Sequence, residues 1–356
     1  MGRRILVTGL GTFWGGRVAQ ALEAEPDVDV IIGLDTRSPT VKLERTEYVR
    51  SDENYSILSR IVAATGVDTI VHTFLVVDST QMSGRTMHEI NVIGTMNLFA
   101  AASAPGSTVR NVVVKSSAHV YGASPADPVW FREDTARKAP VRTRLERNLI
   151  EVEGYVRDFA LDNPHVQVTL LRFSNVVGPT ITTPLTKALR LPVVPSIFGF
   201  DPRFQFTHED DVIRSIQFVL DHGIGGIYNV AGDGLLPWSE VAHICGKRTA
   251  PMPPIATALA TEPLRRLGVD LPPELLTLLR FGRGVDNRRL KSEGFHYHHT
   301  SAGAVQEFVE AGRLRDTVGD HQPAYRYQRD VEQFFRHSPA VIRQPAAAKS
   351  KSPTRR

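Results

Sequence analysis

The sequence predicts an α/β fold built on a doubly wound parallel sheet, with a smaller lobe in its C-terminal half. Short, almost entirely apolar runs of strand length alternate with longer amphipathic stretches through the first two thirds of the chain. Such runs are typical of parallel strands that helices cover on both faces, and the repeated strand–helix order implies right-handed crossovers. The predicted strands cover 5–7, 30–34, 69–71, 112–114 and 168–171, and the predicted helices cover 17–25, 57–65, 86–102 and 145–161.

The regular alternation ends near Asn175, and prolines recur between 192 and 273. Because proline removes a backbone donor and interrupts helices and strands, this part is expected to form a smaller lobe of short elements. An apolar run at 227–230 is expected to return to the main sheet. The predicted organisation is a first domain over 1–175 completed by segments near 205–232, an interleaved lobe over 176–340, and a disordered basic tail over 341–356.

The net charge of +4 over 356 residues belongs to that tail. Five Lys and Arg residues and no acid lie between Ala340 and Arg356, so subtracting these five from +4 leaves −1 for the rest of the chain. A nearly neutral body without a recognition motif predicts no nucleic-acid partner.

Cysteine usage and hydropathy set the expected compartment. Cys245 is the only cysteine, which excludes an intrachain disulfide and a cysteine metal site and favours a reducing compartment. No apolar run reaches about 18 residues, so no membrane span is expected. Strand-like sequence begins at Arg4 and leaves no room for a signal peptide. A cytoplasmic protein is therefore expected.

A glycine-rich turn follows the first predicted strand and leads into a helix; it holds Gly9, Gly11, Thr12, Phe13, Trp14 and Gly15. The glycines allow a tight turn and let backbone N–H groups approach a pyrophosphate at the helix N-terminus. Asp35 ends the next strand, twenty residues after Gly15, where a carboxylate accepts the hydroxyls of an adenosine ribose. This acid favours NAD over NADP, although Arg37 could reach a 2′-phosphate. The competing interpretation is that the glycines only form the turn and that Asp35 is a loop acid.

A series of further motifs follows that turn, and their order is more specific than any one of them. They are Asp52, His72, Asn91-Val-Ile-Gly-Thr95, Ser116-Ser-Ala-His-Val-Tyr-Gly122, Leu171-Arg-Phe-Ser-Asn-Val-Val-Gly-Pro179, Phe206-Thr-His-Glu-Asp-Asp-Val212 and Tyr228-Asn-Val-Ala231. With these motifs the chain, from about Arg4 to Asp286, resembles the extended short-chain dehydrogenase/reductases, and among them the NAD-dependent epimerase/dehydratase family. The resemblance implies a Rossmann-type domain with bound NAD and a C-terminal lobe that grips a nucleotide-sugar or a related small molecule.

The resemblance also implies roles for single residues. Asp52 would contact the adenine, Ser117 would lie beside the nicotinamide, and Asn175 would lie near the phosphates of the substrate. The other motif residues assigned to the cofactor are His72, Asn91 and Ser116, and the others assigned to the substrate are Arg172 and His208.

Structural roles compete with three of these assignments. Asn91 and Asn175 could instead tie loops to the backbone. His208 together with Asp210 could form a strand end and a helix cap.

The chain departs from the family at the residues that carry the chemistry. Family members use Tyr-x-x-x-Lys, in which one helical turn places both side chains on the same face and the lysine lowers the pKa of the tyrosine for acid–base catalysis. Here the corresponding positions are Leu145 and Leu149, or Thr143 and Arg147 in another register. None of the eight tyrosines is followed four residues later by lysine.

The helix face that should carry this chemistry is expected to be core, because Leu145, Leu149, Val152 and Val156 form one apolar stripe at helical spacing. A replacement acid/base would have to come from elsewhere. His119, two residues after Ser117, is the first candidate, since imidazole transfers protons near neutral pH. The alternative for His119 is a packed side chain or a substrate contact.

Two further changes bear on cofactor binding. Thr12 stands where the family has its middle glycine. Phe74 and Leu75 follow His72 where the family has small residues, and their bulk could crowd a dinucleotide.

Two functions fit this pattern. The first is an atypical family member that binds NAD and acts on or binds a nucleotide-sugar-like substrate. The second is a non-catalytic dinucleotide-binding sensor or scaffold, which the Leu145 and Leu149 pair favours. Arg172 and Asn175, in the substrate-side motif, favour a ligand site.

The remaining features predict little chemistry. His296, His298 and His299 lie close together, but no acid or cysteine accompanies them at ligand spacing, so no metal is expected. The apolar, proline-divided segment 255–279 is expected to cap the substrate cleft or to form the contact of a homodimer, and adsorption to a membrane surface is a further alternative.

Overall fold

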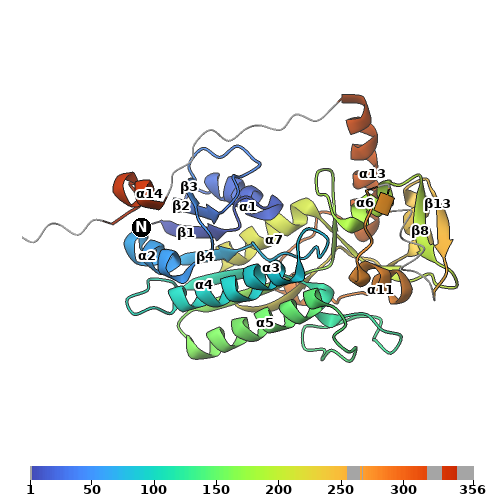
Figure 1. The fold of residues 1–356 in the computed structure, drawn as a ribbon, viewed down its shortest axis with the longest axis horizontal. Helices are drawn as coiled ribbons and strands as arrows, with labels where there is room; N and C mark the ends of the chain where they lie inside the picture. Colours follow the sequence, from blue (N-terminus) through green and yellow to red (C-terminus); the bar gives the residue numbers. More distant parts are fainter. Residues whose placement is uncertain (1, 255–264, 267, 319–330, 343–356) are drawn as a thin grey trace, which may run out of the picture.

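The computed structural model describes residues 2–254, 265, 266, 268–318 and 331–342, and a seven-stranded sheet forms its centre (Figure 1). The strand order is β11-β6-β5-β4-β1-β2-β3, and every neighbouring pair is parallel. The strands are β1 (Arg3–Thr8), β2 (Val28–Asp35), β3 (Glu47–Arg50), β4 (Thr69–His72), β5 (Asn111–Ser117), β6 (Gln167–Phe173) and β11 (Gly226–Val230). The order reverses at β1, and ligands of such sheets bind beyond the carboxyl ends of the strands at this point.

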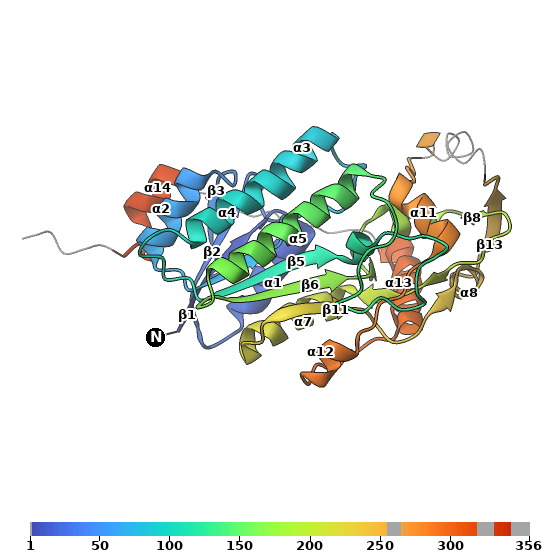
Figure 2. The ribbon, with the colours of Figure 1, turned by 90° about the horizontal axis from the view of Figure 1, so that it is seen from below.

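Helices cover both faces of the sheet (Figure 2). One face carries α2 (Tyr55–Thr65), α4 (Gly94–Ala102) and α5 (Arg144–Asp162), and the other carries α1 (Phe13–Glu23) and α7 (Glu209–His222). Alternation along the strands divides the core accordingly: Leu6, Ile70 and Val112 belong to the first apolar cluster, and Val7, Val71 and Val113 belong to the second. The prediction of a doubly wound α/β sheet is confirmed.

Several bounds differ from the predicted ones. α1 begins at Phe13 because Thr12 caps it, and the strand β3 was not among the predicted runs. The helix predicted over 86–102 consists of α3 (Gly84–His88), a π-helical turn (Glu89–Ile93) and α4.

The smaller lobe lies beyond the carboxyl ends of β5 and β6, which point toward it (Figure 2). Its strands pair as β7 (Asn175–Val177) with β10 (Phe206–His208), β8 (Val193–Ile197) with β13 (Arg248–Met252), and β9 (Arg203–Phe204) with β12 (Leu236–Pro237). Its helices are α6 (Pro184–Arg190), α8 (Trp238–Ile244), α11 (Pro273–Phe281), α12 (Arg288–Ser292) and α13 (Ser301–Val318). A separate apolar cluster around the buried Trp238 forms its core, and Cys245 packs in that cluster.

The last described helix, α14 (Val331–His337), returns to the side of α2 (Figure 1). Phe334 is fully buried in the apolar cluster beneath α2 and α4. The guanidinium of Arg4 in β1 donates to the carbonyl of Ala340 at 2.7 Å, which ties this segment to the first strand. The predicted disordered tail over 341–356 begins too early, because the N–H of Ile342 donates to the carbonyl of Ala64 at 2.6 Å. Residues 343–356 of that tail, like 255–264 and 267 of the apolar segment, lie outside the described residues.

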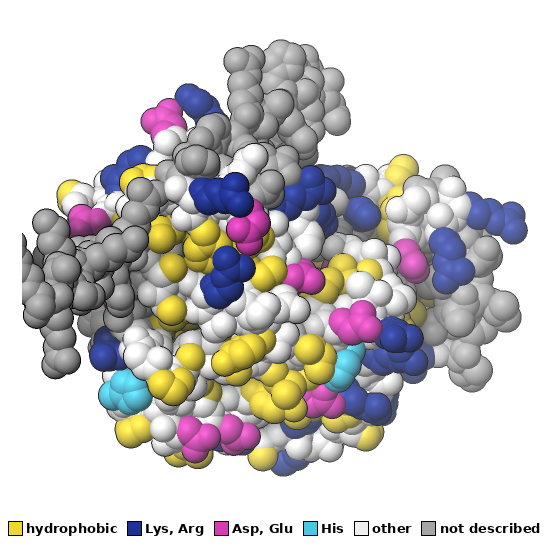
Figure 3. Space-filling model, turned by 60° about the vertical axis from the view of Figure 1, so that its left-hand side comes forward, with side chains coloured by type: hydrophobic (Ala, Val, Ile, Leu, Met, Phe, Trp, Pro, Cys, Tyr) yellow, Lys and Arg dark blue, Asp and Glu magenta, His cyan; other side chains and the backbone are white. Residues whose placement is uncertain are grey.

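The surface mixes the two signs of charge. On the face drawn in Figure 3, Lys and Arg side chains are interspersed with Asp and Glu side chains around a group of hydrophobic ones. None of the described helices combines the length and the hydropathy that a membrane crossing requires.

Candidate functional site

The glycine turn after β1 has no room for side chains. Gly9 has a φ of 76°, and a Cβ there would lie 2.6 Å from the Cα atom of Phe74. A Cβ on Gly15 would lie 2.1 Å from the carbonyl oxygen of Gly9. The hydroxyl of Thr12 donates to that carbonyl at 2.7 Å and accepts from the N–H of Gly15 at 3.1 Å. Thr12 therefore serves as the N-cap of α1, which explains why a threonine is accommodated in place of the usual middle glycine.

Asp35 lies beside this turn at the end of β2. Its carboxylate is 6% exposed and accepts from the N–H groups of Gly11 at 3.0 Å and Arg37 at 2.9 Å. A Cβ on Gly11 would lie 2.4 Å from the carbonyl oxygen of Arg37. The fold thus brings Gly11 and Asp35 together, and the backbone N–H of Arg37 holds the Asp35 carboxylate in place.

Two more carboxyl groups lie near Asp35. Asp52 is exposed, and Glu53 follows it in the loop after β3. Burial, together with the negative charges of Asp35 and Asp52, raises the pKa of Glu53 to about 7. Sequence reasoning missed Glu53, and the signal for it is the pair of adjacent acids after the strand.

His72 points into the protein at the end of β4. Its two ring nitrogens lie 3.1 Å from the hydroxyl oxygen of Thr8 and 2.9 Å from that of Thr95. Burial and the nearby Lys115 cation lower the pKa of His72 to about 3, so the ring is neutral. The ring of Phe74 packs against the imidazole with 4.1 Å between centroids. Phe74 is therefore held in the core under α2 and α4.

Two predicted asparagines bind backbone groups. The side chain of Asn91 exchanges hydrogen bonds of 2.7 and 2.8 Å with the backbone of Val76, which holds the loop after β4. The amide of Asn175 donates to the carbonyl of Gln205 at 3.0 Å and so joins β7 to the segment before β10. Both contacts are of the loop-tying kind that the sequence left open as an alternative.

A cavity of about 120 Å³ lies where β5 and β6 end and the smaller lobe begins. The predicted site residues that it gathers are Trp14, Ser116, Ser117, His119 and Asn175. Most of its other walls are apolar and come from α5, α6 and α11, with Leu145, Leu185 and Leu278 among them. The remaining predicted site residues do not line it.

Ser117 and His119 form a hydrogen-bonded pair in this cavity. The hydroxyl oxygen of Ser117 lies 2.8 Å from Nδ1 of His119 and also accepts from its N–H at 3.3 Å. This cap starts a short 3₁₀ turn (Ala118–Tyr121), which directs the imidazole back toward the serine. Burial and the guanidinium of Arg283 lower the pKa of His119 well below its usual range. A neutral imidazole next to a hydroxyl can accept its proton, and the hydroxyl can in turn bind a substrate oxygen.

The apolar stripe on α5 is buried along its whole length: Leu145, Leu149, Val152 and Val156 are all at most 4% exposed. Leu145 and Leu149 pack with Met87 in a small apolar cluster, and Leu145 also forms part of the cavity wall. The prediction that this face is core is confirmed.

Lys115 lines the same cavity, and sequence reasoning missed it. It lies on β5 between Val114 and Ser116 and is 3% exposed. Burial lowers its pKa to about 8. The available signal was a single cation directly after the apolar run Val112–Val114.

Arg172 lies behind the cavity in a buried ion pair with Glu153 of α5. The shortest distance between the guanidinium and the carboxylate is 2.6 Å, and the hydroxyl of Ser116 donates to the same carboxylate at 2.8 Å. The guanidinium also donates to the hydroxyl oxygen of Tyr121 at 2.7 Å. Arg172 thus links β6 to α5 and to the turn that carries His119.

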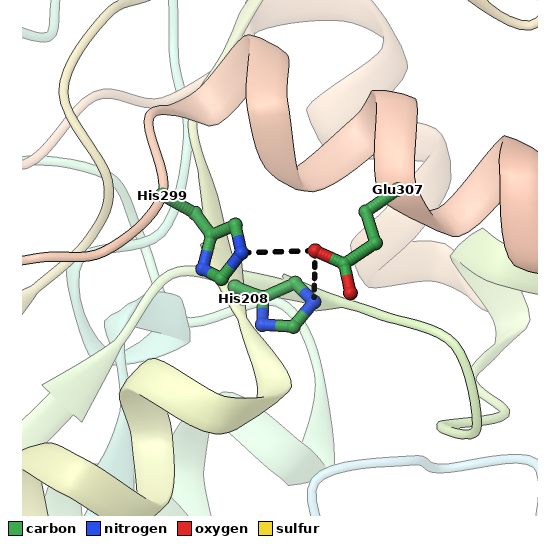
Figure 4. Close-up of side chains that lie close together, drawn as sticks. All are labelled: His208, His299 and Glu307. Carbon is green, nitrogen blue, oxygen red and sulfur yellow. Dashed lines mark ion pairs between the residues drawn. The ribbon is translucent and has the colours of Figure 1, made fainter.

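His208 lies in a cluster with His299 and Glu307 (Figure 4). Its Nδ1 accepts a hydrogen bond from the N–H of Asp210 at 3.2 Å and caps α7. This is the helix-cap role that the sequence offered as an alternative to substrate binding. The carboxylate of Glu307 lies 2.9 Å from Nε2 of His299 and 3.5 Å from Nε2 of His208. The three groups offer possible metal-ligand atoms that lie within 4.8 Å of one another. Without a metal, the Glu307 carboxylate can form an ion pair with a protonated ring of either histidine.

Known proteins are similar to this chain over most of its length. The NAD dependent epimerase/dehydratase family matches residues 5–231. An uncharacterized protein of Mycobacterium tuberculosis (strain ATCC 25618 / H37Rv) is 32% identical over 326 residues, which are 89% of this chain and 86% of that protein. The UDP-glucose 4-epimerase of Thermotoga maritima, solved with UDP-glucose, has a TM-score of 0.67 at 18% identity and covers 87% of this chain and 99% of its own. The dTDP-glucose 4,6-dehydratase of Bacillus anthracis, solved with NAD, has a TM-score of 0.66 at 19% identity and covers 88% of this chain and 98% of its own. The matched family spans more than half of the sequence, and the chain therefore belongs to the NAD-dependent epimerase/dehydratase family.

Proposed function

We propose that this chain binds NAD(H) in preference to NADP(H) and acts on a nucleotide-sugar-like small molecule in the adjoining cavity. The observation that carries the proposal is a shared sheet edge. The glycine turn and Asp35 lie at the carboxyl ends of β1 and β2, and the cavity with Ser117 and His119 lies at those of β5 and β6. A dinucleotide lies across such an edge in sheets of this strand order. The similar epimerase and dehydratase were solved with UDP-glucose and with NAD.

The residues at the glycine turn fit the dinucleotide. Gly9 and Gly15 keep the start of α1 clear of side chains, so backbone N–H groups can approach a pyrophosphate. Asp35 would accept the ribose hydroxyls, and its negative charge disfavours a 2′-phosphate. Asp52 would contact the adenine, and Ser117 would lie at the nicotinamide end. When bound, NAD supplies a hydride acceptor, and its reduced form supplies a hydride donor.

Ser117 and His119 would replace the missing tyrosine and lysine. The hydroxyl oxygen of Ser117 would accept the proton of the reacting substrate hydroxyl while it passes its own proton to Nδ1 of His119, 2.8 Å away. Because the pKa of His119 is lowered, the protonated ring is a strong acid and returns the proton readily. The apolar walls, including Leu145, would keep water away from this transfer.

Replacing His119 with alanine is expected to lower turnover by about 10²- to 10⁴-fold, the usual contribution of a positioned acid/base. The affinity for NAD should change far less, because His119 makes no hydrogen bond to the glycine turn or to Asp35. Conversion of UDP-glucose or dTDP-glucose to product measures turnover, and transient formation of bound NADH measures the hydride-transfer step, because NAD is regenerated in each cycle. His165→Ala, which removes an exposed histidine, is the matched control. Undiminished turnover in His119→Ala would exclude the proposed role.

Replacing Asp35 with asparagine is expected to weaken NAD binding about 10- to 100-fold, because the ribose hydroxyls lose a charged acceptor. NADP binding should change less, since the repulsion of its 2′-phosphate is removed at the same time. Calorimetric titration with both dinucleotides measures the two affinities, and Asp162→Asn on the exposed end of α5 is the control. An unchanged ratio of the two affinities would contradict the assignment of Asp35.

A sensor or scaffold without catalysis is the second candidate, and the buried Leu145 and Leu149 favour it. Mass spectrometry of the nucleotides that co-purify, followed by titration with a panel of nucleotide-sugars, separates the two functions. Conversion of any of these sugars to a product, or reduction of bound NAD by one of them, establishes an enzyme, whereas binding of both ligands without conversion or reduction establishes a sensor. Absence of any dinucleotide binding would exclude both.

A further inference from the structure

Lys115 is a cation without a counter-charge inside the protein. Its side chain lines the cavity beside Ser116 and Ser117 and is 3% exposed. Within the described part of the chain, no hydrogen bond or ion pair reaches its Nζ atom. The face of Trp14 lies near this atom, with the ring centroid 5.6 Å from Nζ.

The two carboxylates that line the same cavity form hydrogen bonds with groups other than Lys115. Glu274 of α11 accepts from the hydroxyl of Ser79 at 3.1 Å, and Asp78 accepts from the N–H of Thr80 at 2.9 Å. An ammonium group that has left water without gaining a partner is costly. Burial accordingly lowers the pKa of Lys115 to about 8. The fold retains a charge at this place although nothing in the described chain neutralises it.

The strand places this charge at the reacting end of the site. Side chains alternate along β5, so Lys115 and Ser117 leave the strand on the same face. The family resemblance places its lysine on α5 at Leu149, which is fully buried, or in the other register at Arg147, and neither residue lines the cavity. The cation of this cavity therefore comes from β5 and not from α5.

We propose that Lys115 is an anion-binding residue that pairs with a negatively charged group of the cavity's ligand. The inference rests on the proposed nucleotide-sugar function, and it specifies that the bound ligand carries a negative charge next to Lys115. Two groups of such a ligand carry it, a phosphate of the nucleotide and a carboxylate of a uronic-acid sugar. Both accept charge-assisted hydrogen bonds from an ammonium group, and either would restore the pKa of Lys115 toward its ordinary value.

Calorimetric titration of the full chain and of Lys115→Met with UDP-glucose and UDP-glucuronate tests the proposal. We expect the substitution to weaken binding about 10- to 100-fold, the effect of losing a hydrogen bond to a charged group. A loss for both compounds identifies the phosphate as the partner, and a loss confined to UDP-glucuronate identifies the sugar carboxylate. Lys115→Arg keeps the charge and should retain part of the affinity. Unchanged affinity of Lys115→Met for both compounds would overturn the proposal.

Two controls distinguish a specific role of Lys115 from a general effect of removing a lysine and from failure of the proposed function. Lys42→Met removes an exposed lysine and should bind both compounds as the unaltered protein does. If the unaltered protein binds neither compound, the proposed function fails, and inorganic phosphate tests the anion site alone. Phosphate should then raise the midpoint of thermal unfolding of the unaltered protein more than that of Lys115→Met. Equal shifts would overturn the site.

Discussion

Lys115→Met is expected to raise the free energy of unfolding of the ligand-free protein by about 2–3 kcal/mol near neutral pH. Burial lowers the pKa of Lys115 from 10.5 to about 8, and each pKa unit corresponds to about 1.4 kcal/mol. Loss of the contact between the ammonium group and the ring of Trp14 offsets about 1 kcal/mol of this gain. Methionine fills a similar volume without a charge, so the substitution removes the desolvation cost and leaves the packing.

The extra stability of this variant should shrink as the pH rises. Because the folded-state pKa of Lys115 lies below the unfolded-state value, the unfolded chain holds one more proton between about pH 8 and 10.5, and the stability of the unaltered protein rises across that window. Below about pH 8 both states carry the charge, so the full difference remains. The other titratable groups that face the cavity are His119, Asp78 and Glu274, with His72 behind it, and both proteins share them.

Urea unfolding of the two proteins at about pH 6.5 and about pH 10 measures this difference. Lys42→Met should match the unaltered protein at both values. A Lys115→Met variant that is less stable near neutral pH would mean that the lysine is retained for its packing and not for a ligand.

Glu153→Gln is expected to destabilise the protein by about 3–5 kcal/mol, the cost of breaking a buried ion pair by removing one partner. Glu153 and Arg172 are 4% and 6% exposed, and the carboxylate binds both the guanidinium and Ser116. The glutamine keeps the shape but leaves the guanidinium of Arg172 without a counter-charge. Burial lowers the pKa of Arg172 and the charge of Glu153 raises it, so the substitution removes the interaction that offsets burial of the guanidinium.

Urea unfolding near neutral pH also tests this expectation. A double variant, Glu153→Leu with Arg172→Met, should recover most of the lost stability, because replacing both members of a buried pair by apolar groups is often neutral. The exposed pair Arg85 and Glu89 on the surface offers a matched control, and Glu89→Gln should change stability by less than about 0.5 kcal/mol. A loss of that small size in Glu153→Gln would show that the buried pair contributes little.

Periodicity predicted the central strands and the flanking helices because strands buried on both faces must be apolar. β3 was not predicted as a strand, because it lies at the edge of the sheet and is not continuously apolar. It begins with Glu47 and ends with Arg50. The π turn at Glu89–Ile93 was not predicted either, because such turns occur inside longer helices and 86–102 was interpreted as one helix.

The candidate site was predictable where its residues are neighbours in sequence. Ser117 and His119 face one another because a single local turn joins them. Lys115 was not predicted as a site residue, because a charged residue after an apolar run indicates the end of a strand. In the structure β5 continues to Ser117. The cluster of His208, His299 and Glu307 joins segments that are distant in the chain, and no local pattern indicates that they meet.

The position of α14 bears on how the chain folds during synthesis. Phe334 completes the apolar cluster that contains Leu6 of β1, and Arg4 binds the carbonyl of Ala340, which lies 336 positions later. A contact of such long range slows folding, because the loop between its ends must close first. While the chain is being made, the emerging first half would expose the surface that Phe334 later covers. The first half of the chain therefore completes its packing only after its last described helix has been synthesised.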